Sequence, residues 1–448
     1  MSPKQAARLR RLLEQLTPCT VQGGRACSKH VHTFGTQTFA KPGGRCLCSF
    51  AASGVHRAGM KSIHGSHFFA TRFSSPAVLL LSAVCASPIG LATEPLPVEK
   101  LTTLPRIQST GPLIYSADKQ RVLLADAETL KWQATLGLPG WRGQFVLPRN
   151  KDLAYLTNSY WERAGQGKRT DFVEVWDVPT ASPTGVRIDV PPRLALSGVD
   201  RTMAGLSADD RLLFLQNATP AASVTVVDTI ANKFIAEIPI PGCFGIYPDA
   251  ETSNKFMALC GDGRMVTVTV DAKRRGAKIE RSAPIFNADE DPLFTASARD
   301  GNSLYFISYG GSVYDIDTSG AIATLVQKYS VVAGVAGGWK PTGEQLLAYA
   351  PEYKVMFALM FPDAKDGDHD NFAKEVWAVD VRTRRVLSRS TISNANGVAY
   401  GPLPTPALFM NDNEAKALVR YAVDPHAGYS VRTDKRLVVS VGMRLEVR

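Results

Sequence analysis

A strand-like run that ends on aspartate, DFVEVWD at Asp171–Asp177, decides the fold. It is rich in β-branched and aromatic residues, which favour β-strands. Six further runs end in the same way: RVLLAD, VTVVD, VTVTVD, VYDID, VWAVD and VRYAVD, ending at Asp126, Asp228, Asp271, Asp317, Asp380 and Asp424. Successive aspartates lie 51, 51, 43, 46, 63 and 44 residues apart. Strand repeats of about 40–50 residues predict an all-β, seven-bladed β-propeller of four-stranded antiparallel blades.

The seven repeated aspartates are expected to cap turns through their side chains. An aspartate at the end of a strand usually accepts hydrogen bonds from backbone N–H groups two or three residues ahead. We therefore expect seven capped turns and no metal site at these positions. Between the aspartates, DDRLLFLQN is expected to begin a new blade, and the Asp-Gly pair of CGDGRMVTVTV predicts a hairpin.

The positive charge lies in the first part of the chain. The 448 residues carry a formal net charge of +10, but residues 1–92 hold eleven Lys/Arg and one acid, Glu14. Residues 93–448 therefore hold 40 of each sign, which argues against nucleic acid as a partner.

Residues 60–92 have the pattern of a secretory signal peptide. Lys61 and Arg72 precede an apolar run at 76–86, and small residues allow cleavage after Ala86 or Ala92. This predicts export to the periplasm, with no membrane span in the mature chain. We interpret residues 1–59 as a non-native or disordered extension, 93–104 as a linker and 105–448 as the propeller.

Two cysteines remain after the expected cleavage site, Cys243 and Cys260. In an exported protein such a pair predicts one disulfide, expected to join adjoining strands of two neighbouring blades; the alternative is two buried thiols.

The sequence shows no catalytic constellation. GQGKRT at 165–170 lacks the spacing of a phosphate-binding loop and is followed by a strand. Only His369 and His426 follow the signal segment, and no hydrolase or metalloprotease motif occurs. The charged stretch DAKDGDHDNFAKE is expected to be a solvated insertion between strands, with calcium binding as the alternative. We expect no catalytic residue and no metal on this chain.

Several stretches resemble the heavy subunit of quinoprotein amine dehydrogenases, and the aromatic amine dehydrogenase branch is closer than the methylamine branch. They are YLTNSYWERAGQGKRTDFVEVWD, LFLQNATPAASVTVVD, GCFGIYP, ALCGDG, DEDPLFTASA, FISYGGSVYDID and KEVWAVDV. The resemblance covers about residues 105–385.

The resemblance implies a periplasmic seven-bladed propeller with a Cys243–Cys260 disulfide. It also implies a heterotetramer of two heavy and two light subunits. The light subunit of the family carries tryptophan tryptophylquinone, made from its own tryptophans, and the catalytic base. Such complexes oxidise primary amines to aldehyde and ammonia and pass electrons to a blue copper protein. This chain would then be a heavy subunit that holds no cofactor and is inactive alone.

Two sets of site residues follow from the resemblance. Tyr160, Arg163, Lys168, Arg169 and Asp171 are candidate contacts to the light subunit. In the family a phenylalanine before the first repeat strand lines the amine channel. The corresponding stretch GPLIYSADKQRVLLAD is short and has no phenylalanine, so Leu113, Ile114 and Tyr115 are the candidate channel wall.

This departure keeps two other functions open. One is a stand-alone periplasmic propeller that serves as a binding scaffold. The other is a lactonase-like propeller with a metal in its central channel, which would need inward-facing Glu, Asn and Asp side chains.

Overall fold

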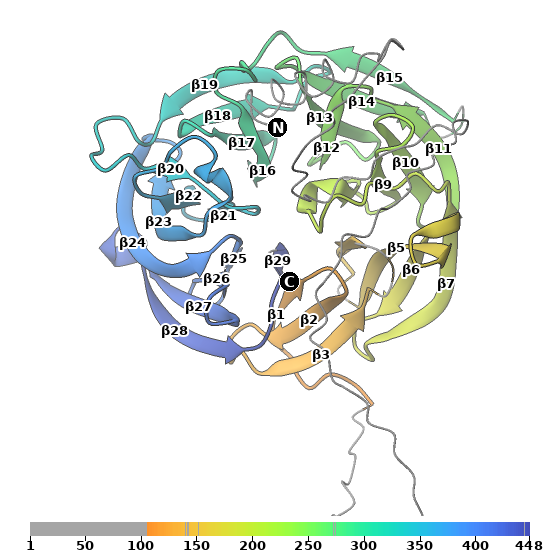
Figure 1. Cartoon of the computed structure of the whole chain (residues 1–448), viewed down its shortest axis with the longest axis horizontal. Helices are drawn as coiled ribbons and strands as arrows, with labels where there is room; N and C mark the ends of the chain where they lie inside the picture. Colours follow the sequence, from red (N-terminus) through yellow and green to blue (C-terminus); the bar gives the residue numbers. More distant parts are fainter. Residues whose placement is uncertain are drawn as a thin grey trace, which may run out of the picture. The chain divides into compact units, whose positions relative to one another are not determined.

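The computed structural model describes residues 105–138, 140, 143–150, 152–271, 273, 275–442 and 444–448. The expected extension, signal peptide and linker lie outside these residues. In the described part, the strands form seven sheets arranged around a central axis (Figure 1), and the only helices are three 3₁₀ turns: η1 (Arg201–Met203), η2 (Asp368–Asp370) and η3 (Pro425–Ala427). No described helix is both long and apolar enough to cross a membrane. The predicted propeller is confirmed.

The first four blades each contain four strands, counted from the axis outward. Blade 1 combines β29 (Arg444–Val447) with β1 (Leu113–Ala117), β2 (Arg121–Asp126) and β3 (Trp132–Gly137). Blade 2 contains β4 (Phe145–Val146), β5 (Leu153–Arg163), β6 (Gln166–Asp177) and β7 (Ser182–Val190). Blade 3 contains β8 (Ala204–Leu206), β9 (Leu212–Asn217), β10 (Ser223–Asp228) and β11 (Lys233–Pro239). Blade 4 contains β12 (Cys243–Pro248), β13 (Lys255–Cys260), β14 (Met265–Asp271) and β15 (Gly276–Arg281).

The last three blades follow the same plan, with one irregular inner position. Blade 5 contains β16 (Leu293–Asp300), β17 (Ser303–Ser308), β18 (Ser312–Asp317) and β19 (Thr324–Ser330). In blade 6, β20 (Lys340–Pro341) and β21 (Leu347–Ala350) both pair with β22 (Val355–Phe361), which β23 (Ala373–Asp380) and β24 (Arg385–Ala395) follow. Blade 7 contains β25 (Val398–Gly401), β26 (Ala407–Asp412), β27 (Ala417–Asp424) and β28 (Ser430–Val438).

The C-terminal strand closes the ring. β29 pairs antiparallel with β1, so that Tyr115 lies opposite Glu446 and Ala117 lies opposite Arg444. The first blade therefore takes its innermost strand from the other end of the propeller chain. This pairing joins the two ends of the propeller segment within one blade.

Apolar layers between neighbouring blades form the core. Side chains of a strand alternate between its two faces, so each blade packs against both neighbours. In β1, Tyr115 packs with blade 2, whereas the adjacent Ile114 packs with blade 7. Further buried clusters join blades 2 and 3, 3 and 4, 4 and 5, and blades 5 to 7.

All seven repeated aspartates cap turns, as predicted. Each ends the third strand of its blade and accepts at least one backbone N–H bond from the residues that follow. Asp380, for example, accepts from Arg382 at 2.8 Å and Thr383 at 3.1 Å. One part of the expected organisation was wrong, because DDRLLFLQN forms the second strand of blade 3, after the short inner strand β8.

The two cysteines form the predicted disulfide, but its place in the fold differs from the expectation. Cys243 in β12 lies directly opposite Cys260 in β13, and the two sulfurs are bonded. The bond therefore joins paired strands of blade 4 and does not link two blades. The expectation was wrong because Cys243, although it follows the outer strand β11 of blade 3, is the first residue of the inner strand of blade 4.

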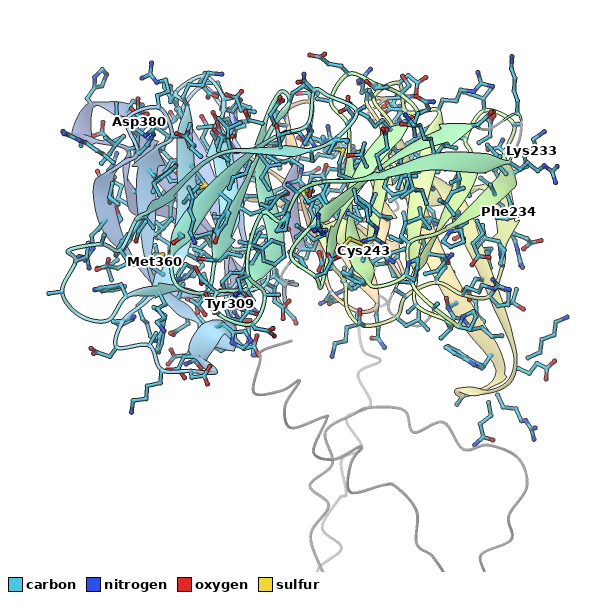
Figure 2. The ribbon with its side chains drawn as sticks, turned by 90° about the horizontal axis from the view of Figure 1, so that it is seen from above. Lys233, Phe234, Cys243, Tyr309, Met360 and Asp380 are labelled. Atoms are coloured by element: carbon cyan, nitrogen blue, oxygen red, sulfur yellow. A yellow bond between two sulfur atoms is a disulfide. The ribbon has the colours of Figure 1, made fainter. Side chains whose placement is uncertain are left out.

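One hairpin projects from one face of the disc. β5 and β6 contain 11 and 12 residues and pair from Leu153–Asp177 out to Arg163–Gln166. Figure 2 shows this hairpin extending below the disc on the side of Tyr309, whereas Asp380 and Lys233 lie toward the opposite side. We call the side with the projecting hairpin the hairpin face.

Candidate functional site

The hairpin of β5 and β6 carries the five candidate partner contacts, and they fall into two groups. Tyr160, Arg163 and Lys168 expose their side chains toward its outer part. Tyr160 stacks on Phe172 with ring centroids 5.7 Å apart. The guanidinium of Arg187 lies 3.9 Å from the centroid of the Phe172 ring. These stacking contacts fix the position of an exposed aromatic and basic surface.

Arg169 and Asp171 form the base of the same hairpin. Arg169 binds Asp171 through two hydrogen bonds of 2.6 and 2.7 Å and donates a third, of 2.7 Å, to the carbonyl oxygen of Leu194. Asp171 also accepts a 3.0 Å hydrogen bond from the Leu194 amide. Because Asp171 is buried, its side chain supports the hairpin, and its assignment as a contact stays a prediction.

Two glycines give the hairpin its tight end. Gly165 and Gly167 have φ of 82° and 86°, a region that disfavours other residues. A Cβ at Gly167 would come within 2.7 Å of a Glu162 carboxylate oxygen. The glycines of GQGKRT therefore serve the turn of the hairpin.

The three candidate channel-wall residues lie in the core. Leu113, Ile114 and Tyr115 are 7%, 0% and 2% exposed, and they pack against the neighbouring blades. None of the three lines the central cavity. Their role in a channel shared with a partner stays a prediction.

A cavity of about 570 Å³ lies on the propeller axis and is lined by residues of all seven blades. Its wall consists largely of the inner strands and the segments beside them. Ten charged side chains line it, and the sequence did not predict this group: Arg149, Asp200, Arg201, Asp210, Asp249, Arg299, Glu344, Arg444, Glu446 and Arg448.

Gln144 connects three blades beside this cavity. Its side-chain oxygen accepts from the Asp200 amide at 3.0 Å and from Arg444 Nη1 at 3.3 Å. Its amide nitrogen donates to the carbonyl oxygen of Gly198 at 2.5 Å. The guanidinium of Arg444 lies 4.1 Å over the Phe145 ring. The C-terminal strand is thereby held against blades 2 and 3.

Two further arginines are held by different partners. Arg448 contacts Glu446 at 2.7 and 2.8 Å, whereas Arg299 donates to the carbonyl oxygens of Pro248 and Gly301 at 2.8 and 3.0 Å. Burial lowers the pKa of Arg299 and of Arg444 to about 10. Both guanidinium groups still carry their charge at neutral pH.

Two glutamates that line the cavity, Glu344 and Glu446, have pKa values shifted in opposite directions. Burial, together with the charges of Asp200 and Asp370, raises the pKa of Glu344, although its side chain is accessible from the cavity. Burial would also raise the pKa of Glu446, but the charges of Arg201, Arg448 and Arg444 outweigh it and lower the pKa. The cavity thus favours ionised Glu446 and disfavours ionised Glu344.

The charged insertion is partly packed onto the hairpin face. His369 stacks on Tyr309 with centroids 4.5 Å apart, and the Thr342 hydroxyl donates to the carbonyl oxygen of His369 at 3.0 Å. Burial, with Asp370 and Glu344, raises the pKa of Tyr309 to about 12. In the described part of the chain, no three His, Cys, Asp or Glu side chains converge as metal ligands. His426 lies in η3, where its backbone N–H is capped by Asp424.

The sequence matches a known family over most of the propeller. A model of the methylamine dehydrogenase heavy chain family matches residues 140–441, from the start of blade 2 to the approach to β29. The chain belongs to this heavy-chain family. Membership accounts for the resemblance seen in the repeat strands and in the hairpin sequence.

The curated relatives are heavy chains of methylamine dehydrogenase. The heavy chain of Methylophilus methylotrophus is 27% identical over 271 residues, which cover 59% of this chain and 65% of the relative. That of Methylorubrum extorquens is 27% identical and covers 62% and 68%. That of Paracoccus versutus is 30% identical over a shorter stretch, 45% and 47%. The matched part of this chain therefore spans about two thirds of the length of the first relatives.

Solved structures share the architecture at low identity. A periplasmic gluconolactonase of Pseudomonas aeruginosa has a TM-score of 0.54 at 14% identity, covering 75% of this chain and 98% of that one. A protein described as a putative 6-phosphogluconolactonase from Bacteroides uniformis also has a TM-score of 0.54, at 11% identity, covering 75% and 99%. At this identity the likeness shows the propeller fold alone.

Proposed function

We propose that this chain is the heavy subunit of a periplasmic amine dehydrogenase. It scaffolds a light subunit that carries tryptophan tryptophylquinone, in a complex of two heavy and two light chains. The reaction converts a primary amine and water to an aldehyde and ammonia, and releases two electrons and two protons. The quinone accepts the two electrons and passes them to a blue copper protein.

Membership of the heavy-chain family is the observation that carries this proposal. The matched region includes the whole β5–β6 hairpin, whose exposed Tyr160, Arg163 and Lys168 are available to a partner. The ion pair between Arg169 and the buried Asp171 carboxylate supports these side chains, so that they need little ordering on binding. In this proposal the chain positions the light subunit and does not perform the chemistry.

The substrate is a primary amine, aromatic or aliphatic. The sequence resembles the aromatic branch, whereas the relatives described above are methylamine dehydrogenase heavy chains. Leu113, Ile114 and Tyr115 are buried where the family would place a channel-lining phenylalanine. We therefore leave the choice of amine to a comparison of methylamine with tyramine.

The burial of these three residues also favours the second candidate, a stand-alone scaffold without dehydrogenase activity. The two functions differ in whether a quinone-bearing partner binds. Co-expression with a candidate light subunit, followed by affinity purification and quinone staining, distinguishes them. The proposal predicts a stained small subunit in the purified complex, and recovery of the propeller alone favours the scaffold.

A further inference from the structure

Arg444 is a buried cation with an incomplete set of partners. The residue is 2% exposed and lines the axial cavity. Its Nη1 donates one long hydrogen bond to Gln144, and its guanidinium stacks on Phe145. Among the described residues its Nε has no hydrogen-bond partner. A buried charged donor without an acceptor costs free energy, so this atom points to a missing acceptor.

Two other guanidinium groups, those of Arg201 and Arg299, belong to the same cavity wall as Arg444. The charge of Arg201 acts unfavourably on both Arg299 and Arg444. In the described part of the chain, the Arg201 side chain makes no hydrogen bond or ion pair, and it is exposed to the cavity that it lines. Carboxylates also line the cavity, but an anion placed between these particular guanidinium groups would reduce their mutual repulsion.

The acids beside these arginines are partly engaged elsewhere. Glu446 contacts Arg448 at 2.7 Å, and Asp249 pairs with Lys255 at 2.9 Å. Asp200 accepts from the backbone N–H and the hydroxyl of Thr202 at 2.8 and 3.0 Å. Glu446 offsets part of the positive charge, but none of these carboxylates makes an ion pair with Arg201 or Arg444 within the described residues.

We propose that the axial cavity binds a small oxyanion, a carboxylate or a phosphate, between Arg201 and Arg444. An oxyanion would supply the acceptor that Arg444 Nε lacks and would reduce the repulsion between the guanidinium groups. A cavity of about 570 Å³ is within the range of small-molecule sites. The site lies wholly on this chain, so it does not depend on the proposed light subunit.

Calorimetric titration of the purified full chain tests this site. Inorganic phosphate and malonate are the two probes, and sodium chloride at matched ionic strength is the control for general screening. The site predicts saturable binding of one anion per chain for at least one probe, and the comparison distinguishes phosphate from carboxylate. Heat no larger than that from chloride would overturn the proposal.

Three variants locate the binding. Arg444→Met and Arg201→Gln are expected to weaken binding at least about tenfold, as loss of a charged hydrogen bond does. Lys233→Gln removes an exposed cation on β11 and should leave binding unchanged. If Arg444→Met does not fold, as judged by thermal unfolding, Arg201→Gln decides the question because its side chain is exposed. Equal binding by wild type, Arg201→Gln and Lys233→Gln would mean an adventitious ion only.

Discussion

Arg169 and Asp171 form a two-hydrogen-bond ion pair, at 2.6 and 2.7 Å, at the base of the projecting hairpin. The pair also binds both the amide and the carbonyl of Leu194, which connects blade 2 to the segment that leads to blade 3. Its carboxylate is buried, whereas the guanidinium is partly accessible. The hairpin is therefore anchored to the disc by a charged clamp beneath its exposed tip.

Arg169→Ala should destabilise the protein by about 3–5 kcal/mol, because it leaves the buried Asp171 carboxylate without its cation. Arg169→Lys should recover only part of this loss, since lysine cannot form the paired hydrogen bonds. Urea unfolding followed by tryptophan fluorescence measures both. An Arg169→Ala midpoint equal to that of wild type would contradict the clamp.

Reversal of charge at the hairpin tip should weaken partner binding without altering stability. Arg163→Glu with Lys168→Glu is expected to reduce light-subunit affinity at least about tenfold, since exposed charges steer and orient association. Lys233→Glu is the matched control, because Lys233 is exposed and lies toward the opposite side of the disc (Figure 2). Surface plasmon resonance with the light subunit measures the three affinities. Equal losses in both variants would mean that the hairpin is not the contact.

Lys255 should be important for joining blades 4 and 5. Its ammonium lies 2.9 Å from Asp249 and donates to the carbonyl oxygens of Thr318, Ser319 and Gly320 at 2.9, 3.3 and 3.1 Å. Lys255→Met removes the cation from a buried pair and should cost about 3–5 kcal/mol of unfolding free energy.

The double variant Asp249→Asn with Lys255→Met should regain part of that stability, because it no longer buries an unpaired carboxylate. Chemical denaturation of Asp249→Asn, Lys255→Met and the double variant provides the test. If the double variant were as unstable as the sum of the single changes, the two residues would not be coupled.

The capped turns predict loss of stability in acid. At Asp126, Asp228 and Asp380, burial would raise the pKa, but hydrogen bonds from backbone N–H groups and neighbouring side chains outweigh it and lower the pKa. The unfolded chain, with aspartate pKa values near about 3.9, takes up these protons first as the pH falls. The stabilisation is therefore complete well above pH 4 and is lost as the pH falls through the folded values.

Urea midpoints at pH 7, 5 and 3 measure this dependence. Asp380→Asn keeps a hydrogen-bond acceptor but cannot be protonated in this range, so it should show a smaller decrease between pH 5 and pH 3 than wild type. An unchanged decrease would exclude Asp380 as a contributor to acid sensitivity.

The sequence predicted the blades but not the axial cavity, for a physical reason. The third strands are six to twelve residues long, are rich in apolar residues and end on a capping aspartate, so each can be recognised in the sequence. The inner strands are much shorter: β4 is Phe145–Val146 and β8 is Ala204–Leu206. Charged residues beside such short strands, including Arg201 and Glu344, look like loop residues in the sequence. Only closure of the ring brings them together with Arg444.

The β5–β6 hairpin was also only partly predictable from the local sequence. Its glycines and its Arg169–Asp171 counter-charge were predictable from local spacing. Local spacing could not show that Asp171 is buried, because burial depends on the segment around Leu194, 23 residues further along the chain.

The central claim is that this chain supports amine oxidation only together with a quinone-bearing light subunit. The most direct measurement mixes the separately purified chains and follows amine-dependent reduction of a redox dye with methylamine and with tyramine. The proposal predicts dye reduction by the mixture with at least one amine, and none by this chain alone. A mixture that forms no complex and reduces no dye with either amine would contradict it.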